Sequence, residues 1–223
     1  MFKKIFLSPF FMPLAFVVLW FALMCGIYCN FTDDLLLQIE DGAMIDVWAK
    51  CGYLLLIVLL FAWADDFKDK VSSWGVYIFL AMGCFLRESG IQHHLSTTDS
   101  TPFKSRFFLN PDNPMYEKVI YGIILLLVFW CIGYLAVKYG KHLFKSFFKL
   151  DTITWSVAVL CVAGVVTKII DRLPANYKHA HHMRLPEDMY VLCQLAEETG
   201  EMFLPYIAIA ILYQYHFLKR GLG

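Results

Sequence analysis

Six long runs of apolar residues, separated by shorter polar stretches, most constrain what this chain can fold into. Each run is close to the roughly 17–25 residues that an α-helix needs to cross about 30 Å of hydrocarbon. Lipid offers no partner to backbone polar groups, so helices are the expected spanning structure. We therefore predict an all-α, polytopic transmembrane helical bundle of about six spans. The predicted spans cover residues 6–28, 47–64, 73–91, 117–137, 152–171 and 198–217.

The composition agrees with lipid as the solvent. Hydrophobic residues make up 59% of the 223 residues and charged residues 17%, whereas soluble domains carry about 25% charged residues. The formal net charge is zero, which argues against nucleic acid as a partner. The length suits one bundle domain over residues 1–223. Membrane lipids are the expected partners, and an apolar bundle face could also contact another protein or a second copy of the chain.

The distribution of lysine and arginine predicts the orientation. With the N-terminus inside, ten basic residues fall on the inner side and six on the outer side. The first outer loop, residues 30–46, is acidic. We predict that both termini face the inside, and the compact architecture favours a bacterial inner membrane. The inner segment 138–150, KYGKHLFKSFFKL, alternates lysine with phenylalanine, which predicts a short amphipathic helix on the anionic inner surface. Ordinary positive-inside bias is the alternative interpretation.

Ionisable residues gather at the outer ends of the third, fifth and sixth predicted spans. Charged groups near membrane depth are costly and often functional. Outer loops add Lys104 and Arg106. The span-end residues are Arg87, Glu88, His93 and His94 in the third span, Lys168, Asp171 and Arg172 in the fifth, and Glu197, Glu198 and Glu201 in the sixth.

Helical spacing places several of these side chains together. Lys168 and Asp171 are three residues apart and share a helix face. Glu197 and Glu198 precede Glu201 by one turn, so three carboxylates project towards one sector and repel one another unless a cation compensates. Protons, the basic loop residues or a divalent metal would each supply that compensation. A non-functional alternative is that these groups anchor the helices in the hydrated headgroup region.

The inner halves of the predicted spans contain few ionisable groups, which disfavours a transport path. A site that opens to the outer side fits better, and one hypothesis is a metal-dependent intramembrane hydrolase acting on a lipid-like substrate. His93, Glu198 and Glu201 would then hold a divalent metal. Glu88 would be the general base, with Asp171 as the second catalytic carboxylate. An anionic headgroup would be bound by basic side chains, namely Arg87, Lys104, Arg106, Lys168 and Arg172.

One short element supports that hypothesis by resemblance. Ser89-x-x-x-His93 resembles the Ser-x-x-x-His element of the alkaline ceramidase and adiponectin-receptor superfamily of membrane hydrolases. That superfamily carries a His-x-x-x-His pair on its last helix. This chain has Glu197-x-x-x-Glu201 in the comparable place, so the resemblance implies a carboxylate-rich metal site.

The second hypothesis is a non-enzymatic membrane protein. The polar residues would then form a structural network that locks helices together, or a surface that binds or senses lipid headgroups, cations or a partner protein. Bound metal in the purified protein would separate the two hypotheses.

Overall fold

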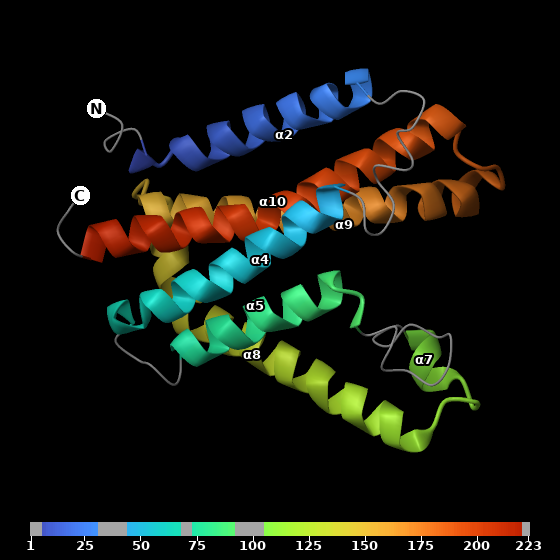
Figure 1. The fold of residues 1–223 in the computed structure, drawn as a ribbon, viewed down its shortest axis with the longest axis horizontal. Coiled ribbons are helices and arrows are strands. Elements are labelled where there is room, and N and C mark those ends of the chain that lie inside the picture. The colour runs from blue at the N-terminus through green and yellow to red at the C-terminus, as the bar shows by residue number, and fades with distance from the viewer. Residues whose placement is uncertain (1–5, 31–43, 68–72, 92–104, 220–223) are drawn as a thin grey trace. The chain divides into compact units, whose positions relative to one another are not determined.

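A computed structural model describes residues 6–30, 44–67, 73–91 and 105–219. These residues form α-helices and one short 3₁₀ helix, with no strand among them (Figure 1). The all-α prediction is confirmed. The helices are α2 (Phe11–Asn30), α4 (Met44–Ala62), the 3₁₀ helix η1 (Ala64–Asp66), α5 (Gly75–Glu88), α7 (Ser105–Leu109), α8 (Met115–Phe147), α9 (Thr152–His181) and α10 (Glu187–Lys219).

Four of the described helices, α2, α4, α8 and α9, are long and apolar enough to cross a membrane, so the predicted number of six spans is corrected to about four. The helix α5 has 14 residues, or about 21 Å at about 1.5 Å per residue, which is shorter than the hydrocarbon layer. The helix α10 has 33 residues, but acidic side chains along its first half shorten its apolar part.

The four apolar helices bury little of their surface. In α2 and α8 only 11% of the most apolar window is buried inside the protein. Large apolar side chains such as Leu126, Phe129 and Trp130 of α8 point outward, each at least 63% exposed. So much apolar surface is stable only against an apolar solvent. The helices therefore identify an integral membrane protein.

The chain divides into two compact units. The first unit comprises Met1–Leu59 and Ser146–Gly223, and the second unit comprises Leu60–Lys145. The first contains α2, most of α4, α9 and α10, and the second contains η1, α5, α7 and most of α8. The prediction of one bundle domain is not tested by this division and stays a prediction.

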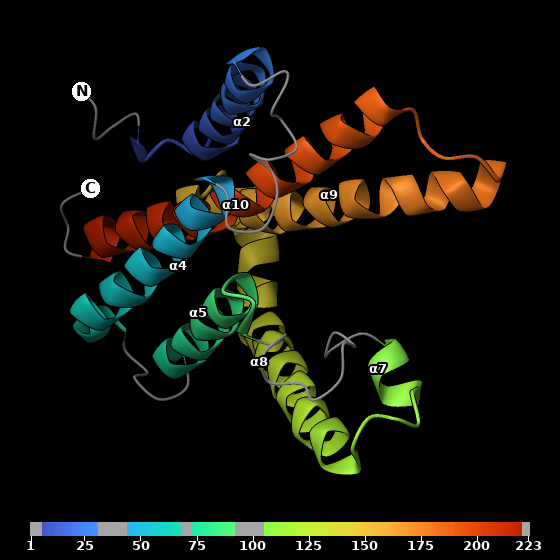
Figure 2. The ribbon, with the colours of Figure 1, turned by 45° about the vertical axis from the view of Figure 1, so that its right-hand side comes forward.

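In the first unit, α9 and α10 lie side by side, and α2 packs against both (Figures 1 and 2). One core cluster joins Met12 and Phe16 of α2 to Ala163 of α9 and Ile207 of α10. At the end of this unit near the N-terminal segment, Gln214 is completely buried and its amide donates to the Phe6 carbonyl at 3.0 Å. Polar and apolar contacts thus hold the three helices together.

Pro205 lies inside α10 without ending the helix. It is fully buried and faces Gly52 of α4, where an added Cβ would come 2.8 Å from Pro205 Cγ. The absence of a side chain at Gly52 therefore lets α4 approach α10 beside the proline.

The ends of three helices differ from the predicted span ends. The helix α9 continues to His181 and stops where His182 adopts a left-handed conformation (φ 54°), so the histidine-rich segment is its exposed last turn. The helix α10 begins at Glu187 rather than near residue 198. The helix α8 continues without a break to Phe147, so the predicted amphipathic inner helix is an extension of the fourth span. Lysine and glutamate are good helix formers, so polar residues did not interrupt these helices.

Gly200 sets how closely α10 approaches α9. A Cβ at this position would overlap Thr167 Cγ2 and lie 3.3 Å from Trp20 Cζ2. We therefore expect Gly200→Val to lower the free energy of unfolding by about 1–3 kcal/mol. The matched control is Gly164→Ala on α9, where an added Cβ meets nothing within 4 Å, and there stability should be unchanged or rise by up to about 1 kcal/mol. Denaturant titration of the purified protein in detergent micelles measures both, and equal stability of Gly200→Val and the natural chain would contradict the packing.

Candidate functional site

The Lys168 ammonium lies among three carboxylates in the first unit. Its Nζ is 2.5 Å from Glu201 Oε1 and 3.8 Å from Glu197 Oε1, both on α10. It is also 3.5 Å from Asp171 Oδ2, one turn further along α9. We call Lys168, Asp171, Glu197 and Glu201 the Lys168 cluster. The structure thus brings together residues that the sequence placed at the ends of separate spans.

Local helix geometry explains why these groups meet. Glu197 and Glu201 are one turn apart on α10, so both project towards α9. Next to them in the sequence, Gly200 has no side chain and lies against Thr167, the neighbour of Lys168. The two helices therefore approach closely beside the charged residues, and the lysine side chain reaches both glutamates.

The side chains of the Lys168 cluster are more buried on the α10 side than on the α9 side. The side chains of Glu201 and Glu197 are 12% and 19% exposed, whereas those of Asp171 and Lys168 are 40% and 46% exposed. With all four groups ionised, one positive and three negative charges sum to −2. Burial disfavours an uncompensated carboxylate, so Glu201, the most buried acid of the cluster, depends most on the ammonium.

A hydroxyl group ties α2 to the same part of α10. Trp20 Nε1 donates to Thr199 Oγ1 at 3.0 Å, and Thr199 Oγ1 donates to the Leu195 carbonyl at 2.5 Å. Thr199 is completely buried. This contact was not predicted from the sequence, although hydroxyl residues directly beside the acidic residues of an otherwise apolar helix are a signal that could have indicated it.

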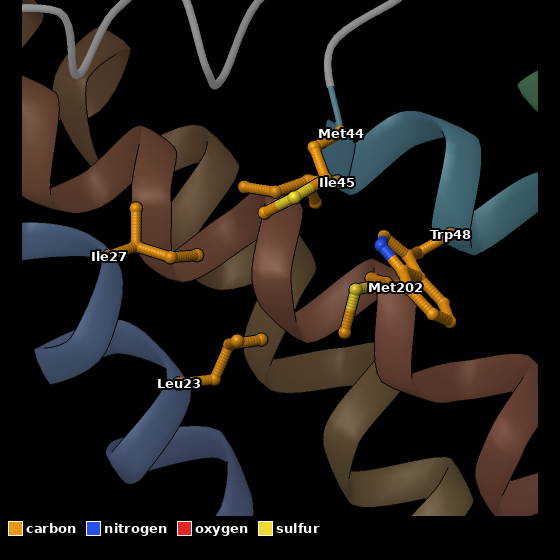
Figure 3. Close-up of a pocket in the computed structure, with 6 residues that line it drawn as sticks. All are labelled: Leu23, Ile27, Met44, Ile45, Trp48 and Met202. Atoms are coloured by element: carbon orange, nitrogen blue, oxygen red, sulfur yellow. The ribbon is translucent and has the colours of Figure 1, made fainter. Parts of the chain in front are cut away.

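Glu198 is half-buried and lies one turn from Leu195 and Met202 on α10. Both of these residues pack with Ile27 of α2 and Ile45 of α4. Beside them is a pocket of about 110 Å³ with an entirely apolar lining. Figure 3 shows the lining residues, which are Leu23, Ile27, Met44, Ile45, Trp48 and Met202. Glu198 thus lies near the apolar contact with α2 and α4, whereas the acids of α10 in the Lys168 cluster are Glu197 and Glu201.

The other predicted site residues are distributed differently. Arg172 of α9 is exposed. Arg87 and Glu88 belong to the second unit, where Arg87 Nε lies 4.0 Å from Glu88 Oε1 and the Glu88 side chain is 17% exposed. The predicted site residues His93 and Lys104 lie outside the described residues, and so does the side chain of Arg106 in α7.

The described residues include no group of three or more His, Cys, Asp or Glu side chains arranged to hold a metal ion. The predicted ligand His93 lies outside this part of the chain. A metal site formed by His93, Glu198 and Glu201 therefore stays a prediction.

Comparison with known proteins adds no relative. No family model, no curated protein and no solved structure matches the chain. The site is therefore interpreted from its own geometry.

The contact between Trp20 and Thr199 provides a test of how α2 is attached. We expect Trp20→Phe to lower the free energy of unfolding by about 1 kcal/mol, because it removes one hydrogen bond. Thr199→Val should cost about 1–3 kcal/mol, because it leaves the indole N–H without its acceptor. The control is Trp130→Phe on α8, whose ring is 63% exposed. A double-mutant cycle on denaturant unfolding measures the coupling, and strictly additive effects would show that the two side chains do not interact.

Proposed function

We propose that this chain is a multi-pass protein of the bacterial inner membrane, with both termini on the inner side, and that it is not an enzyme. Its Lys168 cluster is a structural ion-pair network that fixes α9 against α10. The observation that carries this proposal is the contact of the Lys168 ammonium with Glu201 and Glu197, two carboxylates of the neighbouring helix.

The geometry supports a structural role better than a catalytic one. A hydrolytic metal site needs carboxylate oxygens as ligands and an open coordination position for water. Here Glu201 Oε1 contacts an ammonium at 2.5 Å, so the lysine supplies the positive charge that a metal would otherwise supply. The same ammonium has carboxylates as its partners, which favours a neutralising role over binding of an anionic headgroup.

A membrane protein needs such contacts between helices. In lipid, apolar side chains are as well solvated by acyl chains as by each other, so helices associate through close packing at small residues and through polar contacts. The α9–α10 pair uses both. Gly200 permits the close approach, Lys168 pairs with Glu201, and Ser156 Oγ donates to Gln214 Oε1 at 2.7 Å elsewhere along the pair.

One observation favours a second candidate function, cation binding. Three carboxylates surround one ammonium, and Asp171 is 40% exposed on the accessible side of the cluster. A divalent cation bound here would add positive charge beside these three carboxylates. A metal-dependent hydrolase with Glu198, Glu201 and His93 as ligands is the catalytic form of this candidate.

The ion-pair network predicts a coupling between Lys168 and Glu201. We expect Lys168→Met to lower the free energy of unfolding by about 2 kcal/mol, because it leaves two largely buried carboxylates without their shared cation, reduced from the fully buried case by the partial exposure of the lysine. Adding Glu201→Gln to this variant should recover part of the loss. The coupling energy of the cycle should exceed about 0.5 kcal/mol.

The matched control for that cycle is Lys178→Met, the same substitution at an exposed position ten residues along α9. It should change stability by less than about 0.5 kcal/mol. Additive effects of Lys168→Met and Glu201→Gln on denaturant unfolding would contradict the structural network.

Metal content separates the structural proposal from the hydrolase. We expect protein purified without chelators to contain substoichiometric zinc, manganese and iron by elemental analysis. The double variant Glu198→Gln/Glu201→Gln should show the same metal content, with Glu187→Gln at the exposed start of α10 as the control. One equivalent of metal in the natural chain that is lost in the double variant would reject the structural proposal and support the hydrolase.

A further inference from the structure

Side chains of α9 and α10 bind the residues that precede α2. Thr152 Oγ1 donates to the Leu7 carbonyl at 2.6 Å, and Gln214 Nε2 donates to the Phe6 carbonyl at 3.0 Å. The donors lie 145 and 208 residues further along the chain than the carbonyls they bind. We call residues 6–10 the strap. Two consecutive backbone carbonyls of the strap are thus bound by side chains from two different helices.

Gln214 depends on the strap for its hydrogen bonding. Its side chain is completely buried. Its Oε1 accepts from Ser156 Oγ at 2.7 Å, so the neighbouring helix α9 satisfies the carbonyl half of the amide. The Phe6 carbonyl is the acceptor for the other half. A buried amide donor without an acceptor destabilises a fold, so the strap supplies an acceptor that α10 needs.

Aromatic rings hold the same segment against the start of α9. The Phe10 ring lies 5.9 Å from the Trp155 ring, and the Phe6 ring lies 5.3 Å from the Phe11 ring. Trp155 is itself fixed, because it stacks on Phe147 at 4.7 Å and its Nε1 donates to the Phe147 carbonyl at 3.1 Å. Aromatic pairs at these separations are favourable. The strap therefore has apolar as well as polar contacts with one place in the first unit.

The strap is also continuous with the first turn of α2. The Phe11 N–H donates to the Ser8 carbonyl at 3.1 Å, and the Leu14 N–H donates to the Phe10 carbonyl at 3.2 Å. The first N–H groups of a helix need partners from outside the regular ladder. Release of the strap would therefore also loosen the start of α2, and these two amides report on it.

The side chains that bind the strap come late in the chain. Thr152 and Trp155 belong to α9 and Gln214 belongs to α10, the last helix that the structure describes, whereas α2 comes first among the described helices. Chains are made from the N-terminus onward. The contacts of the strap with Gln214 can therefore form only after α10 has been made.

We propose that Thr152 and Gln214 form a binding site for backbone carbonyls, that the chain's own strap is the ligand, and that its binding fixes the N-terminal end of α2 once α10 is in place. The hydrogen bond between Trp20 and Thr199 fixes α2 further along the helix. None of the strap's contacts involves the Lys168 cluster, so either proposal can fail alone.

Hydrogen–deuterium exchange of the full-length protein in detergent micelles tests this proposal. Thr152→Val and Gln214→Leu each remove one donor and leave the strap sequence intact. We expect each to raise the exchange rate of the amides of residues 6–14 about fivefold, the effect of one lost hydrogen bond on local opening. Amides of α9 around Lys168 should keep their natural exchange. Thr152→Ser, which retains the hydroxyl, should exchange like the natural chain.

The matched control is Gln194→Leu, the same substitution at a half-buried position of α10. It should leave the exchange of residues 6–14 unchanged, and Thr152→Val serves if Gln214→Leu does not fold. Unchanged exchange of residues 6–14 in the folded donor variants would overturn the proposal, and so would an equal rise throughout the protein. Protection that is lost on dilution of a dimer would show that the strap binds a second copy, which would overturn the intramolecular ligand.

Discussion

The pairing of one ammonium with the carboxylates of a neighbouring helix is the interaction on which the first unit depends. Glu197 and Glu201 stand one turn apart on α10 and repel each other, and burial increases the cost of leaving them unpaired. Lys168 reaches both because Gly200 lets the helices approach at this point. Trp20 then fixes α2 to the same turn of α10 through Thr199. Close packing, burial and charge pairing therefore support one another.

Sequence periodicity predicted the helices and which charged residues share a face, but not which helix each face meets. The spacing of Lys168 with Asp171, and of Glu197 with Glu201, correctly grouped residues that meet in the structure. The helix that each charged face contacts was not predictable, because the spans are apolar nearly all round and carry no strong directional pattern. Lys168 was accordingly assigned to an anionic ligand, whereas its ammonium lies among carboxylates.

The predicted span number was wrong because α5 has only 14 residues and the first half of α10 carries acidic side chains. The predicted helix ends were wrong for a different reason. An apolar run predicts only the minimum length of a helix. Polar residues with good helix propensity let the helix continue past the run, as in α8 and α10. The site predicted from the sequence lacked Thr199 and Thr167, because both are small polar residues within apolar helices. Such residues are common at helix contacts in membranes, yet their partners are set by tertiary packing, so Trp20 could not be identified from spacing alone.

Two lysines in the chain show how the surroundings decide what one side chain does. The partners of Lys168 in the cluster are carboxylates, which cancel its charge and leave an excess of negative charge. Lys138 donates to the hydroxyl groups of Ser73 and Tyr134, which hold its ammonium within the second unit. The first arrangement stabilises a contact between helices and attracts cations at most. The second arrangement joins the segment before α5 to α8 through hydrogen bonds.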